Sequence, residues 1–122
     1  SDHEPHALHE KEVEFEISPY GIIVLETFVG LCLTYLVHKG HIDLTTFIEK
    51  VTTNPRKILK LPQIMIEEGR EANLTIFAPD ENWTVDRELF KSKAQNSPFD
   101  GYPLKGKPKY AINNGQIYKC KL

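Results

Sequence analysis

The chain has few cysteines, no excess of basic residues and no long uncharged apolar run. Two cysteines among 122 residues cannot build a disulfide framework, which favours a reducing compartment, meaning the cytoplasm. A net charge of −2 argues against a nucleic-acid-binding domain, which normally has a clustered basic face. Residues 1–6 contain neither the basic nor the apolar region of a signal peptide, so we expect no secretion signal here.

The most apolar segment, residues 22–37, is too short and too polar to predict a membrane anchor. It contains a glutamate and two threonines, whereas a spanning helix needs about 20 apolar residues with few charges. We expect a buried helix over residues 21–38, ended by Gly40. Its polar positions form one narrow stripe, so the helix should be covered on most sides. A chain of 122 residues is too small to cover a helix so completely, so this helix suits a larger protein.

The next segment predicts two further helices. Asp43 is a suitable N-cap for a helix over residues 44–51, whose apolar residues repeat at helical spacing. Asn54 and Pro55 can then begin a short helix that ends near Leu61.

After residue 62 the pattern becomes extended. Residues 72–77 alternate apolar with polar, and residues 83–85 suggest another short strand. Residues 109–112 and 116–118 flank Asn-Gly, the usual signal of a hairpin turn. Helices followed by strands, with no clean linker between them and no internal repeats, predict two structural layers joined in one chain.

Residues 1–20 read as a long polar loop, and its first nine residues hold the densest group of chemically active side chains. Three interpretations compete. His3, His6 and His9 could form a self-contained zinc site, although Pro5 argues against the helix that this would need. The segment could instead be a solvated polar terminus without a role. The third interpretation depends on the order of the residues.

That order resembles dihydroorotases. Ser-Asp-His-Glu-Pro-His at residues 1–6 is similar to the family's Asp-His-Ala-Pro-His signature at the end of the last barrel strand. Further similarities follow in order along almost the whole chain: Pro19-Tyr20-Gly21-Ile22-Ile23, Leu25-Glu26-Thr27, Asn54-Pro55 with Ile58-Leu59, Gly69 with Ala72 and Leu74, Trp83-Thr84-Val85, Ser92-Lys93 with Asn96 and Pro98-Phe99, and Asn114-Gly115-Gln116-Ile117.

The resemblance implies an α/β fold, made of the C-terminal end of an amidohydrolase-type (β/α)8 TIM barrel plus part of a small β-sandwich domain. Residues 1–62 would hold the end of the last barrel strand, the active-site loop and the final barrel helices. Residues 63–122 would hold strands of the small β domain. The implied activity is the zinc-dependent, reversible cyclisation of N-carbamoyl-L-aspartate to L-dihydroorotate in pyrimidine biosynthesis.

Site residues follow from the same resemblance. Asp2 matches the aspartate that contacts the metal and carries the proton to the leaving nitrogen, a task suited to a carboxylate. His6 matches the histidine that binds the substrate carboxylate, and Pro19 and Gly21 match the loop that approaches the pyrimidine ring. His3 falls at a variable position and receives no role, and His9, like His38, is taken as an ordinary surface residue.

Two departures and one absence limit this interpretation. Glu4 replaces the usual alanine, where an inward-pointing carboxylate would repel the substrate, and Asn73 replaces a usual aspartate. The family's other zinc ligands and its substrate-binding arginine and asparagine have no counterpart in this sequence. We therefore expect an inactive fragment that needs a missing N-terminal barrel portion, and an oligomer. A start at Ser1, inside a motif and without Met, also suggests truncation.

Other functions stay open. Allantoinases and dihydropyrimidinases share the Ser-Asp-His beginning but generally lack the Pro-His that follows, and His6 favours a substrate with a carboxylate. A non-catalytic homologue that serves assembly is the third possibility, to which Glu4 lends some support.

Overall fold

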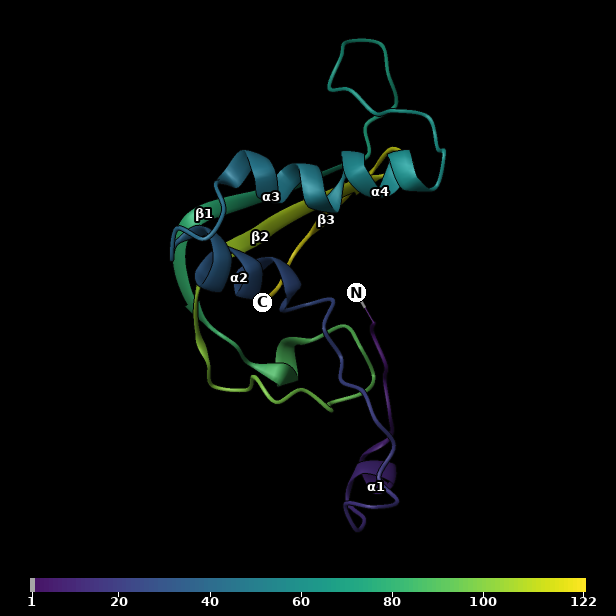
Figure 1. Cartoon of the computed structure of the whole chain (residues 1–122), viewed down its shortest axis with the longest axis vertical. Helices are drawn as coiled ribbons and strands as arrows, with labels where there is room; N and C mark the ends of the chain where they lie inside the picture. The colour runs from purple at the N-terminus through teal and green to yellow at the C-terminus, as the bar shows by residue number, and fades with distance from the viewer. Residues whose placement is uncertain (1) are drawn as a thin grey trace.

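The computed structural model describes residues 2–122, in which helices pack along one side of a three-stranded antiparallel sheet (Figure 1). This mixed arrangement of helices and strands agrees with the predicted α/β class. The elements, in chain order, are α1 (Leu8–Lys11), α2 (Phe28–Cys32), the π-helical turn η1 (Leu33–Val37), α3 (Leu44–Val51), α4 (Thr53–Ile58), β1 (Leu74–Thr84), the 3-10 turn η2 (Arg87–Leu89), β2 (Pro103–Asn113) and β3 (Gln116–Lys119).

The sheet has the strand order β1-β2-β3 and confirms the predicted hairpin. Asn114 and Gly115 connect β2 to β3 with φ angles of 47° and 69°, the two positive values of a type I′ turn. The two strands predicted at residues 72–77 and 83–85 are one continuous strand, β1. Its register against β2 shifts twice, and these irregularities explain why the alternating pattern is broken in the sequence.

The prediction of a helix from residue 21 was wrong at its beginning. Residues 21–26 are not helical, and α2 starts only at Phe28. Ile22 forms a parallel bridge to His3, and the N–H of Ile23 donates to the carbonyl oxygen of Asn96 at 3.2 Å. These long-range bonds hold the segment extended, so tertiary contacts override its helical pattern.

The helix predicted at residues 44–51 is confirmed as α3, with Asp43 at its N-cap. The Asp43 carboxylate accepts a hydrogen bond from the N–H of Thr46 at 2.6 Å. α4 begins at Thr53, slightly earlier than predicted, and ends at Ile58. Pro55 is its third residue, where a missing N–H costs nothing because the first four N–H groups have no partner inside a helix.

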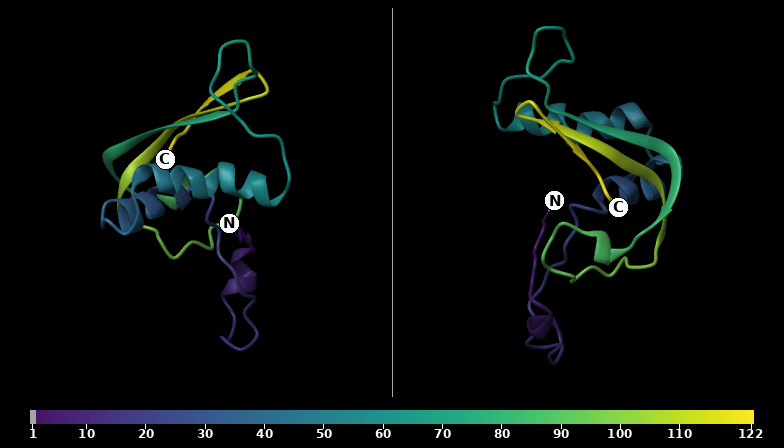
Figure 2. Two further views of the ribbon diagram at one scale, coloured as in Figure 1. Left: turned by 45° about the horizontal axis from the view of Figure 1, so that its top comes forward. Right: turned by 180° about the vertical axis from the view of Figure 1, so that it is seen from behind.

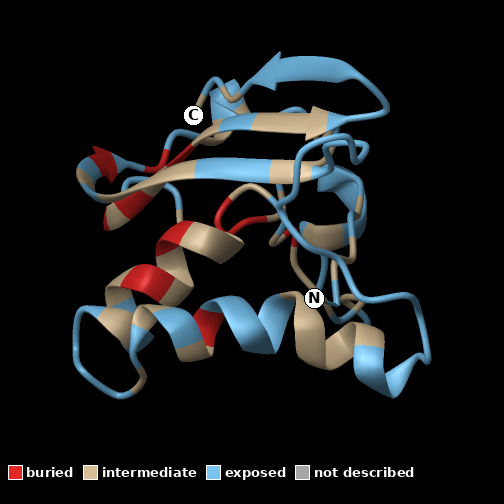
Figure 3. Ribbon diagram, turned by 90° about the horizontal axis from the view of Figure 1, so that it is seen from above, coloured by how far each residue is buried: buried red, intermediate tan, exposed pale blue. Residues whose placement is uncertain are grey.

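The polar stripe of the apolar helix faces the sheet. Thr27 is buried, Gly30 lies against Trp83, and the Thr34 hydroxyl bonds to the backbone N–H and carbonyl of Lys105 at 2.8 and 3.1 Å. Figure 3 shows most of the buried positions where this helix meets the sheet. The apolar sides are left partly open, as Leu36 is 39% exposed, so this chain does not cover the helix as its sequence predicts.

Small residues and one indole make this contact close. Gly106 on β2 has φ +102°, and a Cβ there would overlap the side chain of Leu33, which is fully buried. The Trp83 indole N–H donates to the Gly106 carbonyl at 2.9 Å. Trp83, Val85 and Leu104 form the buried apolar cluster, with Leu31, Phe90, Phe99 and Leu122 packed around them.

Two segments project away from this body: the turn that contains α1, and the loop that joins α4 to β1 (Figure 2). Both carry exposed apolar side chains, including Phe15 at 88% and Ile66 at 88% exposure. Within residues 2–122, no helix combines the length and apolar character needed to cross a bilayer.

Candidate active site

The segment that carries Asp2 and His6 runs beside the segment that follows Gly21. Their connection begins with the parallel bridge between His3 and Ile22, and the Glu4 N–H donates to the Ile22 carbonyl at 3.0 Å. The two chain segments are therefore aligned as neighbouring strands, although neither forms part of the main sheet.

Asp2 is exposed at the start of this segment, and its backbone has φ +53°. Few residues other than glycine adopt this left-handed conformation, although aspartate is among those that tolerate it. The next residue is anchored, because the His3 Nδ1 accepts a hydrogen bond from the Val24 N–H at 3.1 Å. His3, to which the sequence assigned no role, thus fixes the chain immediately beyond Asp2.

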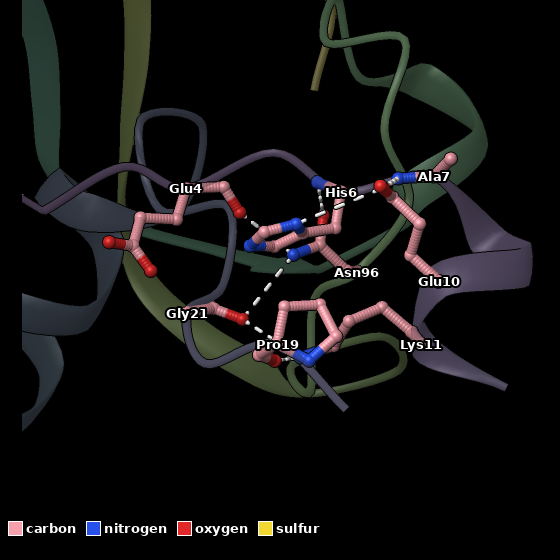
Figure 4. A network of polar contacts seen from close by, with 8 residues as sticks. All are labelled: Glu4, His6, Ala7, Glu10, Lys11, Pro19, Gly21 and Asn96. Atoms are coloured by element: carbon pink, nitrogen blue, oxygen red, sulfur yellow. Dashed lines mark hydrogen bonds and ion pairs between the residues drawn. The ribbon is translucent and has the colours of Figure 1, made fainter. Parts of the chain in front are cut away.

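Glu4 lies against Gly21. A Cβ at Gly21 would overlap the Glu4 side chain, and the φ of +98° also favours glycine at this position. In Figure 4 the Glu4 carboxylate is on the far side of its backbone from the His6 ring. The Glu4 carboxylate therefore points away from His6 and lies beside Gly21.

His6 lines a groove and has one ring nitrogen near a carboxylate. Its Nδ1 lies 3.9 Å from the Glu10 carboxylate, and its buried Nε2 has no hydrogen-bond partner within the described residues. The groove has a volume of about 360 Å³, and its lining consists of Pro5, His6, Ala7, Ser92, Lys93 and Ala94. An imidazole N–H can donate a hydrogen bond to an anionic group.

The loop with Pro19 and Gly21 is held by Lys11. The Lys11 ammonium donates to the Pro19 carbonyl at 2.7 Å and to the Gly21 carbonyl at 3.3 Å (Figure 4). Tyr20, between them, is 90% exposed. Lys11 thereby closes the turn that begins after α1, and it fixes the backbone at both predicted substrate-binding positions.

Asn96 comes from the far end of the chain and touches both segments. Its side-chain amide accepts from the His6 N–H at 3.2 Å and donates to the Glu4 carbonyl at 2.9 Å. Sequence reasoning placed Asn96 in the tail motif without a role, and it gave Lys11 and Glu10 none. No local pattern reveals these contacts, because Asn96 and His6 are separated by 90 positions.

The chain does not supply a complete metal centre. The part of the chain that the structure describes has no group of three or more histidine, cysteine, aspartate or glutamate side chains that could hold a metal ion. His3, His6 and His9 are therefore not brought together as a zinc site. A zinc ion usually has four ligands, so Asp2 does not fit this metal without ligands from elsewhere.

Known proteins of similar sequence are dihydroorotases. The chain is 50% identical over 117 residues to the dihydroorotase of Clostridioides difficile, and 47% identical over 117 residues to that of Chlorobaculum tepidum. These alignments cover 96% of this chain but only 27% of either relative. No protein-family model matches the chain.

Solved structures with the same arrangement are hydantoinases. The L-hydantoinase (dihydropyrimidinase) of Arthrobacter aurescens superposes with a TM-score of 0.76 at 30% identity, over 89% of this chain and 25% of that protein. A D-hydantoinase from Bacillus sp. AR9 gives a TM-score of 0.74 at 23% identity, over 96% of this chain and 27% of that one. The chain thus has the fold of part of these enzymes.

Proposed function

The chain is homologous to dihydroorotases over 96% of its length, and on that premise we propose that it is part of a dihydroorotase. The complete enzyme would interconvert N-carbamoyl-L-aspartate and L-dihydroorotate in de novo pyrimidine synthesis. The identity of 50% to one dihydroorotase, maintained over 117 residues, is the observation that carries this proposal. Because the chain spans about 27% of that relative, the activity belongs to a longer parent protein.

Within that parent, residues 1–62 are the end of the last strand, the active-site loop and the final helices of a (β/α)8 barrel. Residues 63–122 contribute strands to a small β-sandwich domain. The parallel bridge between His3 and Ile22, followed by three helical segments, is compatible with the edge of a barrel. The antiparallel sheet β1-β2-β3 is compatible with a β domain packed beside it.

Asp2 and His6 carry the chemistry that this chain contributes. Asp2 accepts a proton from the water that attacks the ring amide and passes it to the leaving nitrogen, since an exposed carboxylate can exchange protons. His6 binds the substrate carboxylate through its Nε2, which is buried and has no partner among the described residues. The backbone of Pro19 and Gly21, held by Lys11, approaches the ring.

Zinc belongs to the complete enzyme, with its other ligands outside this chain. We accordingly propose that the chain by itself is inactive. Glu4 does not prevent carboxylate binding at His6, because its own carboxylate is turned away from the imidazole (Figure 4). The same carboxylate lies against Gly21, which is itself proposed to approach the substrate, so the non-catalytic alternative stays open.

The exposed apolar surface is compatible with a missing barrel portion as partner. Tyr20 is 90% exposed and Leu25 is 61% exposed in the stretch before α2, and Met65 is 62% exposed in the loop between α4 and β1. Apolar side chains in such number are normally buried against another part of the protein. We propose that they contact the rest of the barrel, and that the parent is a cytoplasmic homo-oligomer.

A second candidate is a hydantoinase or dihydropyrimidinase, favoured by the superposition on the Arthrobacter aurescens enzyme at 30% identity. Allantoinase is the related possibility from the sequence. Dihydroorotate carries a carboxylate that dihydrouracil lacks, so the function of His6 distinguishes the two classes. We expect the parent enzyme to hydrolyse dihydroorotate and to leave dihydrouracil and allantoin almost untouched. Preferred turnover of either other substrate would contradict the proposal.

The first experiment measures zinc content and dihydroorotate hydrolysis for the chain alone and for the chain mixed with its N-terminal portion. The chain alone should have neither bound zinc nor hydrolytic activity, and the mixture should have both. In the parent enzyme, His6→Gln should raise the KM for dihydroorotate, whereas His9→Gln, at an exposed position, should not. Asp2→Asn should lower kcat. Stoichiometric zinc on the isolated chain would show that its histidines form a site by themselves.

A further inference from the structure

Asn96 occupies a position between the two segments that form the candidate active site. It lies in the irregular stretch between η2 and β2, which passes beside residues 3–7 and 21–27. A second contact ties the same stretch down, because the Ser92 N–H donates to the Glu26 carboxylate at 2.9 Å. The stretch that carries Asn96 is thus tied to residues 21–27 at two points, through Ile23 and through Glu26.

Four hydrogen bonds connect Asn96 to these segments (Figure 4 shows those of its side chain). The side-chain oxygen accepts from the His6 N–H at 3.2 Å, while the side-chain nitrogen donates to the Glu4 carbonyl at 2.9 Å and more weakly to the Gly21 carbonyl at 3.4 Å. Its backbone carbonyl accepts from the Ile23 N–H at 3.2 Å.

An amide is the side chain that this position requires. A neutral amide offers an acceptor and two donors on adjacent atoms, so it can bond to one N–H and two carbonyl groups together. Aspartate retains the acceptor but has no donor when ionised, and it would place a negative charge beside two carbonyl oxygens. Alanine retains only the backbone contact to Ile23.

We propose that Asn96 is a positioning residue for the proposed dihydroorotase reaction, which sets the distance between His6 and the Gly21 loop. This inference rests on the proposed function, because it concerns the two groups assigned to substrate binding. Asn96 itself touches no reacting atom. It acts through the backbone of the residues that do, and Lys11 donates to the same Gly21 carbonyl at 3.3 Å.

The position of the contacts predicts which kinetic constant changes. Asn96 bonds to the backbone at His6 and Gly21, both proposed to bind substrate, and it has no hydrogen bond to Asp2, the proposed proton carrier. A displacement of about 1 Å in a binding group can cost on the order of 100-fold in rate. We expect most of such a loss in kcat/KM for Asn96→Ala to come from a higher KM.

The test uses the full-length parent enzyme loaded with zinc, with Asn96→Ala and Asn96→Asp as variants. Asn73→Ala is the matched control, because Asn73 is an exposed asparagine on the approach to β1. Phe47→Leu is the control for stability alone, because Phe47 is buried in α3 away from these contacts. Both Asn96 variants should lose about 100-fold in kcat/KM for dihydroorotate, mainly through KM, with zinc content unchanged. Both controls should keep the KM of the unaltered enzyme.

Hydrogen exchange of the backbone amides tests the Asn96 contacts without any measurement of activity. In Asn96→Ala the amide of His6 should exchange faster than in the unaltered enzyme, and in Asn73→Ala it should not. An unchanged KM, or a loss no greater than that of Phe47→Leu, overturns the inference. If the unaltered parent does not turn over dihydroorotate, the proposed function fails by itself. In that case the exchange rate of the His6 amide tests the positioning contact by itself. Faster exchange in Asn96→Ala supports the contact, and unchanged exchange overturns it.

Discussion

The contact between Gly106 and Leu33 makes a quantitative prediction about how the helix and the sheet fit together. Gly106→Ala forces a non-glycine residue to φ +102° and drives its Cβ into the Leu33 side chain. The backbone strain costs about 1–2 kcal/mol and the overpacking about 1–3 kcal/mol. We expect the free energy of unfolding to fall by about 2–5 kcal/mol in total.

Leu33→Ala perturbs the same contact in the opposite direction. Leu33 is 0% exposed, so its truncation leaves a cavity and should cost about 2–5 kcal/mol. In the double variant Leu33→Ala removes the Cγ and Cδ1 atoms that the new methyl would meet, but it keeps the Leu33 Cβ, 2.8 Å from that methyl. Part of the overlap is thereby relieved, so the double variant should be about 1–2 kcal/mol more stable than the sum of the single changes.

The assay is urea unfolding of the chain, followed by the fluorescence of its one tryptophan. Trp83 is 8% exposed and donates to the Gly106 carbonyl, so it reports on the region that the substitutions alter. Leu89→Ala is a matched control for Leu33→Ala, since Leu89 is 47% exposed and should tolerate truncation. Additivity of the two single effects within about 0.5 kcal/mol would refute the proposed overlap.

Two further predictions concern ionisable groups. The backbone N–H of Thr46 lowers the pKa of Asp43, so this carboxylate should stabilise the folded chain above its ordinary pKa of 3.8 and lose that effect as the pH falls through the lower folded value. The stability difference between the unaltered chain and Asp43→Ala, from urea unfolding at several pH values, should therefore shrink in acid; a difference that grows in acid would contradict this. Burial raises the pKa of the Cys32 thiol, so iodoacetamide at pH 8 should alkylate it more slowly in the folded chain than in urea, as followed by mass spectrometry. Equal rates would show that the thiol is not protected.

Elements with local signals were predictable from the sequence. The N-cap at Asp43 and the Asn114-Gly115 turn each depend on a few adjacent residues, and both are confirmed. The order of motifs that resembles dihydroorotases is confirmed by the identity of 50% to one of them. The division into residues 1–62 and 63–122, and the roles of Asp2, His6, Pro19 and Gly21, stay predictions.

Long-range contacts were not predictable. The helix predicted from residue 21 begins at Phe28, because Ile22 and Ile23 bond to residues far away in the sequence. The apolar helix turns its polar stripe towards the sheet, where Thr34 bonds to Lys105 across 71 positions. Amphipathic pattern alone cannot show which face meets which partner when most of a helix is apolar.

What the sequence determined by itself was the local structure and the family of proteins that the chain resembles. Capping and turn chemistry act over a few bonds, and similarity of sequence depends only on the order of residues. Tertiary structure alone decided that Asn96 joins His6 to Gly21, and that Glu4 turns away from the imidazole. Those arrangements come from hydrogen bonds and packing between segments as much as 92 residues apart, which only the folded chain brings together.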